Sequence, residues 1–160
     1  GVPESAVGIL WIVAPVCEIV TMLFFSHFAR RFSARHLLLA ACVSGVLRWI
    51  GMAYATELWQ LVLLQTLHMM TFGLAYMGIV TFIANWTSEE IAAQAQSFFV
   101  VLKQICSVIA LLFFGALVAR FGLQSFWAAG LLSAIGAGMI LISLTIWSTK
   151  AQNEARPLSQ

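Results

Sequence analysis

Residues 58–84 read LWQLVLLQTLHMMTFGLAYMGIVTFIA, a run without a single Asp, Glu, Lys or Arg. A helix needs about 20 mostly apolar residues to cross the hydrocarbon core of a bilayer, and this run exceeds that length. It lacks the strand-like alternation of a membrane barrel, and a backbone in lipid must satisfy its own hydrogen bonds. The run therefore predicts a transmembrane helix.

Four similar apolar runs flank this one, at residues 6–25, 37–55, 91–119 and 126–147. The 160-residue chain is 62% hydrophobic and 9% charged, against about 45–50% and 25% in soluble domains. This composition excludes a water-soluble globule. It predicts an all-α integral membrane helical bundle of five transmembrane helices in residues 1–147, with a tail over residues 148–160. The start at Gly1 rather than Met predicts a fragment or a processed chain.

The basic residues predict the orientation of the bundle. The connection at residues 26–36 carries three arginines and the tail carries Lys150 and Arg156, whereas the opposite side has Arg120. Cytoplasmic loops carry the excess of Lys and Arg. We therefore expect a cytoplasmic C-terminus and an N-terminus of this chain on the outer side.

Several function classes are excluded by what the sequence lacks. Eight scattered Lys and Arg residues give a net charge of +2, which offers no footprint for nucleic acid. The three cysteines lie in apolar runs without a C-x-x-C spacing, so neither a metal site nor a disulfide is expected. No nucleophile motif and no Asp are present, which argues against an enzyme. We expect no cofactor.

Ionisable side chains inside the apolar runs are the candidate functional residues, because such groups are costly in a membrane and by default mark a site or a pathway. Glu18, Arg48, His68 and Lys103 each lie on a different predicted helix. At about 1.5 Å per residue, all four lie roughly 10–20 Å from the nearer end of their run, so they can converge at mid-membrane. Two have simpler alternatives: Lys103 can extend to the interface, and His68 can hydrogen-bond to a neighbouring helix.

Helical spacing places other side chains on the same faces as these ionisable groups. A cavity for a small, partly polar ligand is predicted, lined by Trp11, Gln65, Phe72 and Tyr76, although aromatic residues at this spacing are also typical of ordinary packing. Cations outnumber carboxylates at this depth, which predicts an anion supplied by an acidic ligand or by an acidic residue outside this chain. The last run carries Gly130, Ala134 and Gly138, a ridge expected to pack against another helix.

Local motifs give this pattern a family resemblance. They are SAVGILW at residues 5–11 with Glu18, FSARHLLL at residues 32–39, GVLRW at residues 45–49, and QTLH at residues 65–68 with TFG at residues 71–73. Together they resemble the C-terminal half of a major facilitator superfamily transporter. The likeness is greatest to the phenylpropionate permease group, which is related to lactose permease.

The resemblance implies an architecture and roles for the candidate residues. The five runs would correspond to helices 8 to 12 of a twelve-helix fold, without the N-terminal half and the first helix of the C-terminal half. Glu18, Arg48 and His68 would serve proton coupling and substrate binding. Lys103 would pair with an acid on the missing helix. Thr71 stands where the sugar-carrying relatives have a second carboxylate.

The expected function is secondary active transport in a cytoplasmic membrane, and a bacterial inner membrane is the location we expect. A protein containing this chain would take up a small organic solute, such as an aromatic or aliphatic carboxylate, with protons by alternating access. The alternatives are a sugar–proton symporter of the same superfamily and a non-transporting membrane assembly subunit. The expected partners are the lipid bilayer, the substrate and protons.

Overall fold

A computed structural model describes residues 7–146, and every regular element in this range is helical. In chain order these are α1 (Val7–Leu23), α2 (Phe25–Arg31), α3 (Ala34–Tyr54), α4 (Leu58–Thr66), the π-helix η2 (Met69–Leu74), α5 (Ala75–Trp86), α6 (Glu89–Phe121), the 3₁₀ turn η3 (Gly122–Ser125) and α7 (Phe126–Ile146). The prediction of an all-α bundle is confirmed for these residues. The side chain of Trp11 and the predicted tail at residues 148–160 lie outside the described part.

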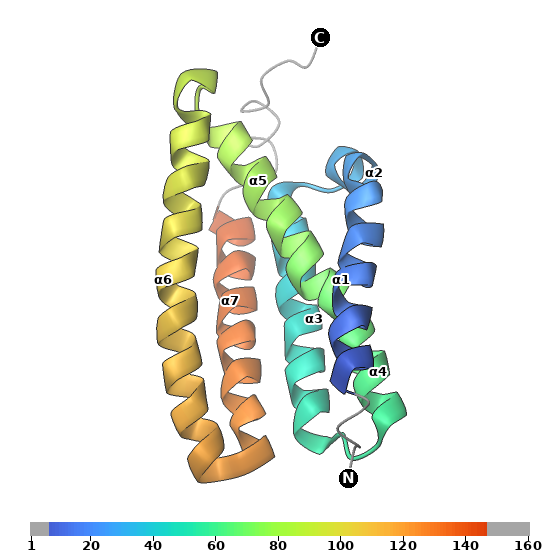
Figure 1. The fold of residues 1–160 in the computed structure, drawn as a ribbon. Coiled ribbons are helices and arrows are strands. Elements are labelled where there is room, and N and C mark those ends of the chain that lie inside the picture. The colour runs from blue at the N-terminus through green and yellow to red at the C-terminus, as the bar shows by residue number, and fades with distance from the viewer. Residues whose placement is uncertain (1–6, 147–160) are drawn as a thin grey trace.

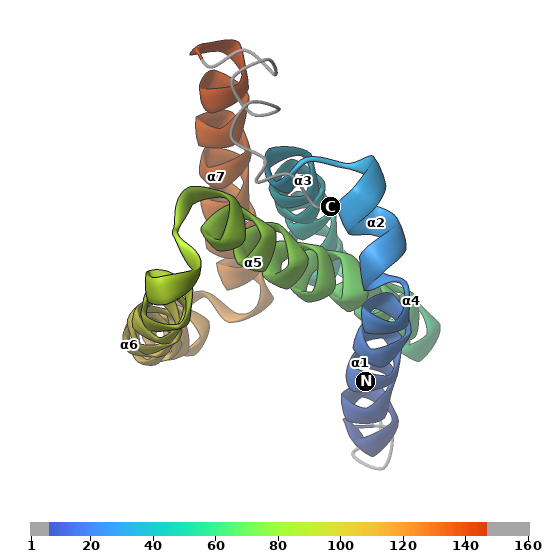
Figure 2. The same cartoon turned by 90° about the horizontal axis from the view of Figure 1, so that it is seen from above.

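Helix α3 lies at the centre of the bundle (Figure 1). It contacts α7 on one side and α5, η2 and α4 on the other, and α1 packs in turn on η2 and α4. A small core of Leu37, Ala41, Leu74 and Met77 joins α3 to the η2–α5 segment. Helix α6 touches the rest mainly through η3 and α5 at its two ends, and from above it stands apart from α7 (Figure 2).

Close packing of α3 on α7 depends on small residues. A Cβ at Gly45 would lie 2.9 Å from Ser133 Oγ, and one at Gly130 would lie 3.3 Å from an Ile50 side-chain carbon. The predicted ridge was wrong beyond Gly130, because Ala134 is exposed and nothing lies within 4 Å of a Cβ at Gly138. The cause is helix geometry: each four-residue step overshoots a 3.6-residue turn by about 40°, so a strict spacing of four leaves the contact face.

The surface of the described residues fits a lipid environment. Three stretches are long and apolar enough to cross a membrane: Ala34–Tyr54, Leu58–Trp86, and Glu89–Ile146, which contains both α6 and α7. The apolar helix Ile12–Leu23 is shorter. None of the 33 residues of α6 is buried, and large apolar side chains cover its outside. The chain is thus part of a membrane-embedded protein.

The connection predicted at residues 26–36 is more ordered than its polar sequence indicates. Helix α2 occupies most of it, and Ser33 begins α3 by accepting a hydrogen bond from the backbone of His36. Arg35 is buried, and its Nη1 donates to the carbonyl oxygen of Ser143 at 2.6 Å and to the Ser143 hydroxyl at 3.3 Å. This carbonyl belongs to the last turn of α7, whose acceptors lack partners within their own helix. Arg35 therefore ties the start of α3 to the end of α7.

Candidate functional site

The most deeply buried charge in the site lies in the second half of α3. Arg48 is 5% exposed, and taking a cation out of water costs several kcal/mol unless other groups compensate. Its Nη2 donates to Gln65 Oε1 on α4 at 2.8 Å, and its Nη1 donates to Thr71 Oγ1 on η2 at 3.5 Å. The guanidinium carbon also lies 4.7 Å from the ring centroid of Trp49, at a cation–π distance.

All these partners of Arg48 are neutral. Within residues 7–146 no carboxylate forms an ion pair with the guanidinium, and its Nε is buried without a hydrogen-bond partner. Buried charges in proteins are normally paired, and buried donors are normally satisfied. The site therefore holds a positive charge with one buried nitrogen that lacks a hydrogen-bond partner, which is an arrangement that suits an anion.

His68 lies beside this charge at the junction of α4 and η2. Its ring stacks on Phe72 with centroids 4.2 Å apart, and its Nδ1 is buried without a partner. The Thr71 hydroxyl donates to the backbone oxygen of His68 at 3.0 Å, which leaves its oxygen to accept from Arg48. Arg48, Thr71 and the His68 backbone thus form one hydrogen-bonded chain.

The π-helix η2 positions this chain. The sequence predicted a single uninterrupted helix over residues 58–84, whereas the structure changes hydrogen-bond register at Met69–Leu74. Short π segments insert one residue into a helix and occur often at functional sites. On the other face of η2, a Cβ at Gly73 would lie 2.8 Å from a Thr21 methyl carbon, so glycine lets α1 approach closely.

Two of the four predicted ionisable residues do not join the cluster. Glu18 is half-buried on α1, and no hydrogen bond or ion pair links it to Arg48 or His68 in the described structure. Lys103 is exposed on α6, away from α3. The structure thus brings Arg48 and His68 together, while roles for Glu18 and Lys103 stay predictions.

Of the residues predicted to line a cavity, some contact the Arg48 cluster and others do not. Gln65 contacts Arg48, and Phe72 contacts His68, but Phe72 and Tyr76 are each 51% exposed. The described residues contain no group of three or more His, Cys, Asp or Glu side chains able to hold a metal ion. The cavity lined by Trp11, Gln65, Phe72 and Tyr76 stays a prediction.

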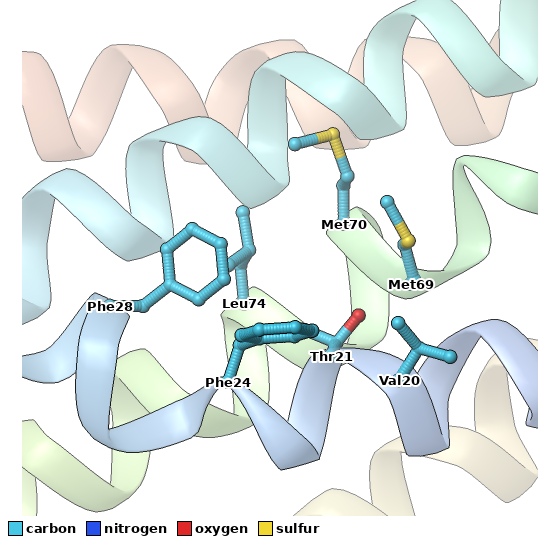
Figure 3. Close-up of a pocket in the computed structure, with 7 residues that line it drawn as sticks. All are labelled: Val20, Thr21, Phe24, Phe28, Met69, Met70 and Leu74. Atoms are coloured by element: carbon cyan, nitrogen blue, oxygen red, sulfur yellow. The ribbon is translucent and has the colours of Figure 1, made fainter.

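An apolar cavity that the sequence did not indicate lies between α1, α2 and η2. It has a volume of about 110 Å³. Figure 3 shows the phenyl rings of Phe24 and Phe28 at one end and the thioethers of Met69 and Met70 at the other. Thr21 lines this cavity and also lies against Gly73, a contact that a sequence pattern does not reveal.

Comparison with known proteins agrees with this architecture. The model of the MFS_1 like family matches residues 1–104. The chain belongs to the major facilitator superfamily. This superfamily chain is 31% identical over 133 residues to the "Probable 3-phenylpropionic acid transporter" of Escherichia coli strain K12, and the match covers 83% of the chain. No solved structure matches significantly.

Two features of the superfamily match bear on the site. The resemblance seen in the motifs is confirmed, and the matched residues 1–104 include all four candidate ionisable residues but exclude α7. The match covers 35% of the Escherichia coli relative, so the chain spans about a third of that relative's length.

Proposed function

We propose that this chain is part of a secondary transporter that moves a small organic carboxylate, whose carboxylate group binds Arg48. The observation that carries the proposal is a guanidinium only 5% exposed, held by neutral side chains and with its Nε unused. A carboxylate accepts from arginine in a planar, often bidentate arrangement, and such charge-assisted bonds are the strong ones. A ligand carboxylate would thus supply the missing anion.

The relative's name supports this substrate class. That protein is described as a probable transporter of 3-phenylpropionic acid, which is an aromatic carboxylic acid. The aromatic rings around the cluster, Trp49 and Phe72, suit the same class of ligand. An aromatic carboxylate is therefore our first candidate, and an aliphatic carboxylate is the second.

Proton coupling is the finer part of the proposal. Glu18 lies half-buried on α1 and forms no ion pair with Arg48 or His68 among the described residues, and we assign it the role of proton carrier. When Glu18 is protonated, it is compatible with apolar surroundings. When it is ionised, it would pair with Arg48 or His68. Proton and substrate occupancy would bias the rocking of two halves between outward-facing and inward-facing states.

The setting of the site belongs to the same proposal. The helices of this chain would correspond to helices 8 to 12 of a twelve-helix transporter in a bacterial inner membrane, with the C-terminus in the cytoplasm. Further sequence would supply the N-terminal half and the first helix of the C-terminal half. Lys103 would pair there with an acidic residue.

A sugar is the second candidate substrate. The Gln65 amide and the Thr71 hydroxyl offer neutral hydrogen-bonding groups next to aromatic rings, which is also what a sugar needs. The charge distinguishes the two, because a neutral sugar leaves the Arg48 cation without an anion.

Uptake by proteoliposomes tests the proposal. The protein expressed from its complete reading frame is reconstituted, and accumulation of labelled 3-phenylpropionate is measured with and without an inward proton gradient. We expect gradient-dependent uptake that Arg48→Gln abolishes and that Arg31→Gln, at an exposed position on α2, leaves unchanged. Uptake of sugars but of no carboxylate would refute the proposal.

A further inference from the structure

The apolar cavity beside η2 has almost no polar wall. The side-chain oxygen of Thr21 is the one polar side-chain atom among the seven lining residues besides the two thioethers, and its hydroxyl already donates to the Cys17 carbonyl at 3.0 Å. A water molecule needs two to four polar partners, and cavities without them stay dry or take up apolar molecules. The cavity is therefore suited to an apolar group.

The size and walls of the cavity favour one aromatic ring. Its volume is about 110 Å³, and an apolar cavity of about 150 Å³ takes up benzene. Methionine side chains adapt to the shape of what they contact, and their sulfur atoms contact aromatic rings favourably. Phe24 and Phe28 offer ring faces and edges from the other end (Figure 3). The volume therefore matches one six-membered ring better than two fused rings, with a small movement of Met69 or Met70 to admit it.

Met70 connects this cavity with the Arg48 cluster. It lines the cavity, and its sulfur also accepts a hydrogen bond from Ser44 Oγ at 3.8 Å. Ser44 lies one helical turn before Arg48 on α3, a rise of about 6 Å. Met69 and Met70 also lie between His68 and Thr71 in sequence. The same π segment therefore presents polar groups to α3 and apolar groups to α1.

We propose that this cavity receives the apolar end of the carboxylate whose charged end is bound by Arg48, and that Val20 and Met69 limit that end to a single ring. The proposal rests on the proposed function for the identity of the charged end. It assigns the selection among carboxylates to α1 and η2. Arg48 on α3 binds the carboxylate group, which all these acids share.

Binding of three acids to the full-length protein tests this assignment. Isothermal titration calorimetry compares 3-phenylpropionate, propionate and 3-(2-naphthyl)propionate. We expect phenylpropionate to bind at least about tenfold more tightly than propionate. Val20→Phe, which directs a ring into the cavity, should remove this advantage and leave propionate binding unchanged. The matched control is Ile19→Phe, because Ile19 is 60% exposed and does not line the cavity.

Enlarging the cavity gives a test with the opposite sign. Met69→Ala should raise the affinity for the naphthyl acid by about tenfold relative to the phenyl acid. The proposal would be overturned if Val20→Phe lowered the affinities for phenylpropionate and propionate equally. It would also be overturned if Val20→Phe and Ile19→Phe lowered the affinity for phenylpropionate equally. A naphthyl acid that binds the wild type as tightly as the phenyl acid would overturn it too.

An uncharged ring separates this proposal from the proposed function. Binding of 4-fluorobenzyl alcohol is followed by ¹⁹F line broadening in wild type and both α1 variants. Broadening lost only in Val20→Phe, together with no binding of any acid, refutes the function proposed for Arg48 and supports the ring site. Line broadening that is identical in Val20→Phe and Ile19→Phe overturns the proposal that the cavity binds the ring, whether or not the acids bind.

Discussion

Gln65→Glu is the most direct perturbation of the proposed anion site. Gln65 Oε1 already accepts from Arg48 Nη2 at 2.8 Å, and the substitution changes an amide into a carboxyl of nearly the same shape. The guanidinium would then have an internal counter-ion. A ligand carboxylate at Nε would face this new negative charge instead of an unbalanced cation.

The size of the effect follows from the geometry. Two carboxylates that bind different nitrogens of one guanidinium lie about 6 Å apart, and their repulsion at an effective dielectric constant of about 20 is about 3 kcal/mol. Each 1.4 kcal/mol is a factor of ten in affinity, so the dissociation constant for the carboxylate should rise about a hundredfold. Acidification that protonates the new carboxyl should restore binding in the variant.

Titration calorimetry of 3-phenylpropionate with the full-length protein measures this effect. Gln104→Glu is the matched control, because it introduces the same charge at an exposed position on α6. Gln65→Met separates charge from geometry: it removes the acceptor without adding a charge, and we expect a loss below about tenfold. Unchanged or tighter binding in Gln65→Glu, with the thermal unfolding of the protein unaltered, would refute the placement of the ligand carboxylate at Arg48.

Three further predictions concern coupling and packing. Glu18→Gln should abolish uphill, proton-driven accumulation but retain exchange of labelled for unlabelled acid across proteoliposomes; accumulation that persists would exclude Glu18 from coupling. Gly45→Leu should destabilise the protein by about 1–3 kcal/mol, because its Cβ alone would lie 2.9 Å from Ser133 Oγ; an unchanged apparent Tm in detergent would contradict the close α3–α7 contact. Arg35→Met should cost about 1–3 kcal/mol by leaving the Ser143 carbonyl without its donor, and Arg31→Met should not lower the Tm.

The helices were predictable from the sequence because lipid imposes a simple rule on it. A backbone surrounded by hydrocarbon must form its own hydrogen bonds, so each long apolar run folds as a helix. The changes within those helices were not predictable. The break at Phe24 and the π register at Met69–Leu74 occur without a proline in either segment, and α1 lies close to the π segment at Gly73, a contact that no sequence pattern predicts.

The site was predictable to the extent that its residues are unusual in a membrane. Arg48 and His68 are conspicuous in apolar runs, and Gln65 shares the face of His68. Thr21 was not singled out, and Thr71 was noted only as the residue in place of a carboxylate, because a threonine can satisfy its hydroxyl on the preceding turn of its own helix, as both do here. Only the three-dimensional contacts show that Thr71 also accepts from Arg48 and that Thr21 lines a cavity.

The two cations inside the apolar runs, Arg48 and Lys103, differ in their need for an anion. In α6 the polar N-terminal part ends at Ser97 and a run of five apolar residues follows, so Lys103 lies only about 9 Å into the apolar part of its helix. Helical side chains lean toward the N-terminus, and a lysine chain of about 6 Å brings the ammonium back near the polar end. Arg48 is 5% exposed, and hydrogen bonds to Gln65 on α4 and Thr71 on η2 hold its guanidinium inside the bundle. Pairing of Lys103 with an acid outside this chain stays a prediction, whereas the buried unpaired charge belongs to Arg48.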